Sequence, residues 1–260
     1  MTPETLMLGW LWRQLPEEPA TWLAGQWERL RAGVSERDFN LAISLAPRRV
    51  GKADLALTAS DLIAADQARP GWDPRGWSVD QAARLVLLLA GGGDGPAFAA
   101  RLRGLLATAD LPETIAFLRG LPLYPNPELH LARAREGARS GMRPIFEAVA
   151  HANPYPAEMF DEAAWNQLVL KALFIETTLA PIQGLDARAN PTLMRMLCNY
   201  AHERWAAGRP VSPELWRCVG PYADDAARED LGRVLRNGDA PEREAARAAL
   251  ALAPAGSKAG

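Results

Sequence analysis

The sequence lacks the features that mark secreted, membrane-spanning and general nucleic-acid-binding proteins. Its two cysteines, Cys198 and Cys218, are too few for a disulfide framework and favour a reducing compartment. The longest unbroken apolar stretch, Leu85 to Ala90, is far shorter than the roughly 20 residues that cross a membrane. The N-terminus has no basic leader before a clean apolar run, so it predicts no signal peptide. With 29 basic and 31 acidic side chains, the net charge is −2, which offers nucleic acid no positive excess. We therefore expect a cytoplasmic protein.

Residues that favour strands are scarce, whereas residues that favour helices dominate. The 260 residues include 48 Ala and 36 Leu but only 9 Val and 6 Ile, and Ala and Leu lose little rotamer freedom in a helix. No segment alternates apolar and polar residues for long enough to form a half-buried strand. The sequence therefore predicts an all-α fold: an irregular antiparallel helical stack or bundle, or a HEAT-like solenoid. From start and stop signals we expect helices near residues 4–14, 20–31, 36–46, 58–68, 79–90, 96–108, 112–120, 127–139, 142–151, 158–179, 191–207, 213–218, 222–236 and 241–252.

Several of these helices begin at residues that are typical N-caps. Ser35 and Ser78 are in position to accept from the first turn, and Gln81 completes a capping box with Ser78. Asn190 and Ser212 each precede a proline at the first helical position.

The chain shows no composition shift that would divide it. Residues 91–95, GGGDG, are the one low-complexity joint and could form a hinge. We nevertheless predict a single all-helical domain over residues 1–253, whose last two helices resemble a HEAT-type hairpin. A disordered tail is expected over residues 254–260.

Lys171 stands in the most apolar helix of the sequence. Residues 168–175 read LVLKALFI, and a helix that is apolar on all sides is buried on all sides. No carboxylate lies three or four residues from Lys171. The lysine either extends its amine past the core edge into solvent or pairs with an acid from a later segment, for which Asp186 and Glu203 are the nearest candidates.

If the amine is held inside, we expect a buried polar cluster that either locks the fold or lines a ligand pocket. Its predicted members are Lys171, Glu176, Asp186, Arg188, Tyr200, His202, Glu203 and Arg204.

Signatures of catalysis and of cofactor or metal binding are missing from the sequence. His202-Glu203 begins a zinc-protease motif, but Ala206 stands where the second histidine is required. Cys198 and His202 are four residues apart and could share a metal, yet the remaining ligands are not evident. Neither a Gly-x-Ser-x-Gly elbow nor a phosphate-binding loop occurs. We therefore predict no catalytic residues, no metal and no cofactor.

Nine tryptophans are present, four of them at positions 10, 12, 22 and 27. They suit the core of a large helical protein. Alternatively, the N-terminal helices present them to a partner protein; attraction to anionic lipid would be weak, since Arg13 is the only basic residue before Arg29.

Long segments resemble one family. They read FDEAAWNQLVLKALF at 160–174, GLDAR at 184–188, YAHERWAAGR at 200–209 and PELWR at 213–217. Upstream they read FNLAISLAPRRVG at 39–51, LRGLPLYP at 118–125 and FEAVAHANPYP at 146–156. From about residue 36 to about residue 252, the sequence is similar to the EboA family of bacterial metabolite-traffic proteins.

The resemblance implies a role shared with other proteins of the same system, among them a prenyltransferase-like membrane protein and TIM-barrel-like partners. Together they are thought to move precursors of specialised metabolites from cytoplasm to periplasm. The family supplies no catalytic residues. We therefore expect a non-catalytic binding or adaptor protein with protein partners and a small-molecule ligand, either cytoplasmic or held at the inner membrane by a partner. The alternatives are a purely structural scaffold and an enzyme of unrecognised type.

Overall fold

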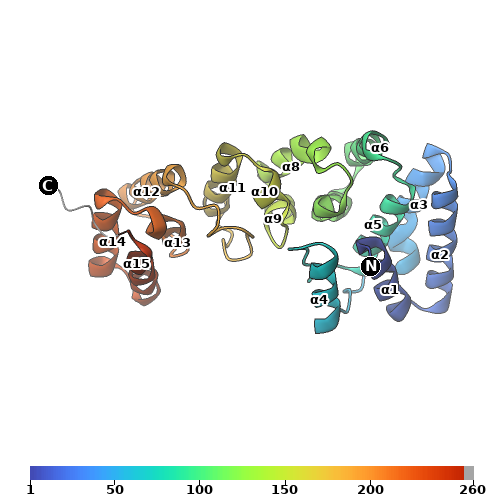
Figure 1. The fold of residues 1–260 in the computed structure, drawn as a ribbon, viewed down its shortest axis with the longest axis horizontal. Coiled ribbons are helices and arrows are strands. Elements are labelled where there is room, and N and C mark those ends of the chain that lie inside the picture. The colour runs from blue at the N-terminus through green and yellow to red at the C-terminus, as the bar shows by residue number, and fades with distance from the viewer. Residues whose placement is uncertain (255–260) are drawn as a thin grey trace. The chain divides into compact units, whose positions relative to one another are not determined.

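The computed structural model describes residues 1–254, and within that range all regular structure is helical (Figure 1). It comprises fifteen α-helices and three short 3₁₀ helices, and an isolated bridge pairs Asp54 with Ser78. The prediction of an all-α fold is confirmed. The tail predicted over residues 254–260 lies, apart from Pro254, outside the described residues.

Contacts divide the chain into two compact units, of which the first spans Met1–Met159 and the second begins at Phe160. The glycine joint at residues 91–95 lies inside the first unit, where it connects two helices, and does not separate the units. The single-domain organisation stays a prediction.

The first unit contains ten α-helices. These are α1 (Pro3–Gln14), α2 (Glu17–Ala32), α3 (Glu36–Val50), α4 (Ala59–Ala68), α5 (Val79–Gly91), α6 (Gly95–Thr108), α7 (Leu111–Arg119), α8 (Leu131–Ala138), α9 (Arg143–Ala150) and α10 (Tyr155–Met159), with 3₁₀ helices η1 (Leu121–Leu123) and η2 (Pro127–His130) before α8.

Helix α5 is the centre of this unit and packs against α1, α2, α3 and α7. Its capping box joins Ser78 and Gln81 as predicted, and nearly all of its side chains are buried. Beside it, Trp72 lies 5.4 Å from Trp10 and 6.0 Å from Trp77 between ring centroids. These three tryptophans are core residues, as one of the two interpretations held. Of the four N-terminal tryptophans, however, only Trp10 is buried: Trp12 is 38% exposed, and Trp22 and Trp27 are half-buried.

An ionic network is buried in α5, where the sequence analysis placed none. Arg84 is 2% exposed and donates through Nη1 to Asp80, itself 4% exposed, one turn earlier. Its Nη2 lies 3.5 Å from Oε1 of Glu113 on α7. A buried ion pair involving an apolar helix was one of the two alternatives for Lys171. The structure has one instead at Asp80 and Arg84.

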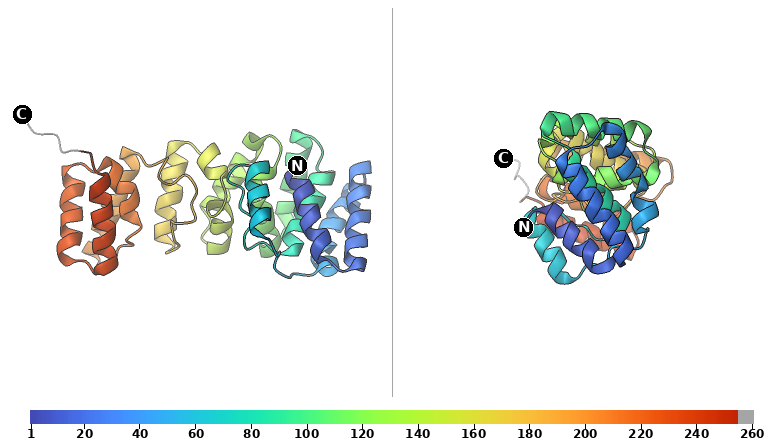
Figure 2. Two further views of the ribbon diagram at one scale, coloured as in Figure 1. Left: turned by 60° about the horizontal axis from the view of Figure 1, so that its bottom comes forward. Right: turned by 90° about the vertical axis from the view of Figure 1, so that its right-hand side faces the viewer.

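The second unit contains α11 (Glu162–Phe174), α12 (Pro191–Ala206), α13 (Leu215–Val219), α14 (Asp225–Asn237) and α15 (Ala240–Leu252), with η3 (Gly220–Tyr222) after α13. Helices α14 and α15 lie side by side and form a hairpin, as Figure 2 shows. Helix α12 packs against α11 and α13, and α13 packs against α15.

One helix predicted over residues 158–179 is two helices in the structure. Asp161 accepts a hydrogen bond from the Ala164 amide and starts α11 anew after α10 has ended at Met159. At the other end, Glu176 has φ +56°, a left-handed conformation that stops an α-helix. The chain then passes through Thr177 and Thr178 without helix.

Other helix ends also differ from the prediction, among them one end of α3 and one of α13. Helix α3 continues through Pro47 to Val50. The proline removes one backbone hydrogen bond, but its fixed φ is compatible with a helix. Helix α13 begins at Leu215 rather than at residue 213, and the residue before it, Glu214, replaces Ser212 at the cap position.

Close packing at Gly220 predicts opposite effects for two glycine substitutions in the second unit. A Cβ on Gly220 would lie 2.6 Å from the carbonyl oxygen of Ala249 and 2.8 Å from its Cα, which are backbone atoms of α15 and cannot rotate away. We expect Gly220→Ala to lower the free energy of unfolding by about 1–3 kcal/mol through overpacking.

The matched control is Gly232→Ala, inside α14. Its Cβ would approach only Nη1 of Arg236, the far end of a flexible side chain, at 3.3 Å. We expect it to raise the free energy of unfolding by about 0.5–1 kcal/mol, because alanine loses less backbone entropy in a helix. The free energy of unfolding of both variants is measured by hydrogen exchange of the α15 amides in urea. If both substitutions changed it in the same direction, the packing described at Gly220 would be wrong.

Candidate functional site

The eight side chains predicted to cluster do not form one buried group. None of them is among the buried polar residues of the range 1–254. Lys171 is half-buried, and its Nζ lies 5.3 Å from the ring centroid of Phe174. Within the described residues it has no carboxylate partner, neither Asp186 nor Glu203. The expectation of an ionic core around Lys171 is thereby corrected: the amine reaches the core edge and rests on an aromatic ring.

The other predicted residues of the cluster use different partners. Asp186 accepts two hydrogen bonds from Arg217, which lower the pKa of its carboxyl, and both side chains are exposed. His202 Nε2 lies 2.7 and 2.8 Å from the two carboxylate oxygens of Asp230.

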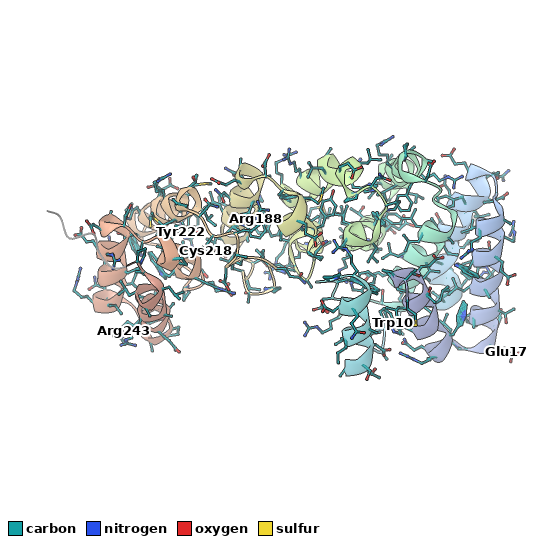
Figure 3. The ribbon with its side chains drawn as sticks, viewed as in Figure 1. Trp10, Glu17, Arg188, Cys218, Tyr222 and Arg243 are labelled. Carbon is teal, nitrogen blue, oxygen red and sulfur yellow. The ribbon has the colours of Figure 1, made fainter. Side chains whose placement is uncertain are left out.

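Arg188 serves the core of the second unit in another way. Its guanidinium lies 4.8 Å from the ring centroid of the fully buried Trp165 (Figure 3 labels Arg188). Cation–π contact of this kind stabilises packing, so Arg188 has a structural role there.

Four predicted residues do converge, on a surface hollow of the second unit. The hollow has a volume of about 400 Å³ and lies between the ends of α11 and α12. Ligand pockets typically measure about 300–1,000 Å³, so a small molecule fits. Its walls are the predicted Glu176, Tyr200, Glu203 and Arg204, together with Leu170, Phe174, Ala207 and Arg209.

Hydrogen bonds fix two of these walls in place. The Tyr200 hydroxyl donates to the Leu173 carbonyl, 3.1 Å away, and ties α12 to the last turn of α11. Arg204 Nε donates to the Pro210 carbonyl at 3.0 Å, and its Nη2 lies 3.5 Å from Oε1 of Glu176. Arg204 therefore joins α12, the end of α11 and the segment that follows α12.

A second hollow, of about 440 Å³, adjoins the first and shares Glu176, Tyr200 and Arg204 with it. Its rim carries hydroxyl groups, and its wall is stabilised by Glu214, which accepts from the Thr178 hydroxyl at 2.6 Å and from the Leu179 amide at 2.7 Å. Because the two hollows share three lining residues, we describe them together as the α11–α12 depression.

Phe174 is the most exposed large apolar residue of this site that the sequence did not predict; the other unpredicted residues of the first hollow are Leu170, Ala207 and Arg209. It is 70% exposed, although it belongs to the segment predicted to be buried on all sides. Leu170 and Phe174 are four residues apart and lie outside the buried stripe formed by Leu168, Val169, Ala172 and Leu173. This spacing could have been read from the sequence. Leu170 and Phe174 are more apolar residues than a single buried helix face accommodates, which indicates that they lie on another face.

A thiol-based catalytic site is disfavoured by the surroundings of both cysteines. Cys198 lies one turn from His202, but its Sγ contacts the Met194 sulfur at 4.0 Å. Burial, together with the nearby charge of Asp230, raises the pKa of Cys198 to about 12. Burial raises the pKa of Cys218 to about 12 as well. Both groups are neutral thiols near pH 7, and the thiolate is the nucleophile.

Metal ligands do not gather either: no group of three or more His, Cys, Asp or Glu side chains with metal-binding geometry occurs in residues 1–254.

Comparison with known proteins assigns the chain to a family. A family model described as metabolite traffic protein EboA matches residues 4–220. The chain belongs to the EboA family. Neither a curated protein nor a solved structure matches it. The resemblance that the sequence analysis drew from its motifs is confirmed, and the family description points to metabolite traffic.

All residues that line the α11–α12 depression lie within the segment that the EboA model matches. A third hollow, of about 380 Å³ beside Trp205, draws part of its lining from α14 and α15, beyond that segment. In the described part of this EboA-family chain, no helix has the length and apolar character needed to span a membrane.

Proposed function

We propose that this EboA-family chain is a non-catalytic binding and adaptor protein in the traffic of specialised-metabolite precursors from cytoplasm to periplasm. The α11–α12 depression is its ligand site. The observation that carries the proposal is the concave surface itself: side chains from α11, α12 and the residues that follow them border an open hollow of about 400 Å³ beside an aromatic ring that is 70% exposed. Covering an exposed aromatic ring in a depression with a ligand removes apolar surface from water and so stabilises the complex.

The chemistry of the depression supports binding without turnover. Its polar groups are three glutamates, two arginines, two threonines, a serine and a tyrosine whose hydroxyl already donates to a carbonyl. Neither cysteine lines it, and both thiols are buried. Such a site can hold and release a molecule unchanged.

The partners that we propose are other proteins of the same traffic system, including a prenyltransferase-like membrane protein that would hold the chain at the inner membrane. In this arrangement the chain hands its ligand to the partner. A purely structural scaffold would need no depression of this kind.

Native mass spectrometry of the untagged protein, purified from its own cells, tests the ligand site. We expect a small molecule to co-purify with the wild-type chain and to be lost from Phe174→Ala, which removes the exposed ring. Ile63→Ala is the matched control, because Ile63 is 60% exposed but belongs to the first unit; it should retain the molecule.

Two outcomes would overturn the proposal. Retention of the same molecule by Phe174→Ala and by the wild-type chain would place binding elsewhere. Conversion of the isolated ligand to a new compound by the purified chain would establish an enzyme.

A further inference from the structure

We infer that the ligand of the α11–α12 depression is a monoanionic amphiphile, with a flat apolar part against Phe174 and one carboxylate-like group against Arg209 and Lys171. This inference rests on the proposed ligand site and names the chemical class of its occupant.

The apolar half of the depression is built around Phe174. Of the large apolar side chains in the described range, only Met1 is more exposed, and Phe174 still has 70% of its surface free although Lys171 lies near its ring. Leu170, one turn earlier, lines the same wall. Aromatic faces pack with flat rings or chains at a gain proportional to the apolar area covered.

Around the first hollow, three cations face two carboxylates: Arg204 and Arg209 line it with Glu176 and Glu203, and Lys171 lies at its edge beside Phe174. Arg204 is partly neutralised by Glu176 at 3.5 Å. Glu203 and Arg209 line the hollow, and neither has a side-chain partner within residues 1–254. Lys171, whose amine lies 5.3 Å from the Phe174 centroid, adds a cation for which the described residues supply no acid.

Arg209 is the group best placed to bind the anion. Unlike Arg204, whose Nε is engaged by the Pro210 carbonyl, the side chain of Arg209 makes no hydrogen bond within the described residues. Arginine presents a planar fork of donors that matches a carboxylate with two parallel bonds. Arg209 and Phe174 line one hollow, so a short ligand reaches both.

The experiment compares three probes that share one ring and differ in their charged group: 2-naphthoate, 2-naphthalenemethanol and 2-naphthylmethylammonium. Dissociation constants are measured by protein-observed NMR titration at low and high salt. We expect 2-naphthoate to bind at least about tenfold more tightly than the alcohol, the effect of one charge-assisted hydrogen bond, and the amine to bind most weakly. Added 0.5 M NaCl should reduce this preference, because it screens exposed charges.

Variants assign the preference to its residues. Arg209→Gln and Lys171→Gln should each weaken 2-naphthoate and leave the alcohol unchanged, while Phe174→Ala should weaken all three probes. Arg195→Gln is the matched control, since Arg195 is an exposed arginine of the same helix that does not line the depression.

Equal affinity for the three probes, or tightest binding of the amine, would overturn the anionic class and leave the ligand site intact. If no probe binds, or if Phe174→Ala changes nothing, both the anionic class and the ligand site are wrong.

Discussion

Replacing Arg84 by alanine is expected to destabilise the first unit by about 3–5 kcal/mol. The guanidinium is 3% exposed and is the counter-charge of Asp80, which is 5% exposed as a side chain. Truncation leaves a carboxylate inside α5 with the Ser78 hydroxyl as its remaining partner, and an unpaired buried charge carries this cost. Hydrogen exchange of α5 amides in urea measures the loss.

Two further variants separate the charge from the volume. Arg133→Ala removes a half-buried arginine paired with the exposed Glu136 and should cost less than about 1 kcal/mol. In the double variant Asp80→Leu with Arg84→Met, apolar side chains replace both buried charges, and we expect much of the loss to be recovered. A cost below 1 kcal/mol for Arg84→Ala would mean that the two charges reach solvent.

Trp165→Ala is expected to destabilise the second unit by about 3–5 kcal/mol, the usual cost of emptying a tryptophan site in a core. Trp165 is 0% exposed and is covered by the Arg188 guanidinium. Its indole N–H has no acceptor within the described residues. Hydrogen exchange of α11 and α12 amides measures the change.

The missing acceptor makes phenylalanine an informative comparison. Trp165→Phe loses part of the ring but also removes a buried donor that nothing satisfies, so we expect it to cost only about 1–2 kcal/mol. Trp12→Ala removes a tryptophan that is 38% exposed and should cost clearly less than Trp165→Ala. Equal losses in Trp165→Ala and Trp165→Phe would show that the ring's volume is not what the core requires.

Local signals predicted the helices well. The excess of alanine and leucine gave the all-α class, and capping at Ser35, Ser78 and Asn190 is found in the structure. These signals involve residues three or four apart in the chain, so a sequence pattern can contain them. The left-handed turn at Glu176 was not predicted, because glutamate has no sequence preference for that conformation.

Long-range pairing could not be obtained in the same way. Lys171 and Arg84 occupy similar apolar helices, and Lys171 meets the ring of Phe174 three residues later in its own helix. Only the approach of Glu113 from α7 to Arg84 depends on the tertiary arrangement. For Arg84 a local signal did exist: Asp80 precedes it by four residues, the spacing of a helical ion pair. Four members of the predicted cluster nevertheless line the depression, because Tyr200, Glu203 and Arg204 follow one another along the last turns of α12.

The two native cysteines, both enclosed by packed helices (Cys218 is labelled in Figure 3), have a practical consequence. Since each thiol is protonated and buried near neutral pH, we expect maleimide reagents not to react with them. A cysteine introduced at a solvent-facing position of each unit would then be the sole target for spin labels or fluorophores. Distances between such labels would measure how the two halves of the chain are arranged, with and without ligand.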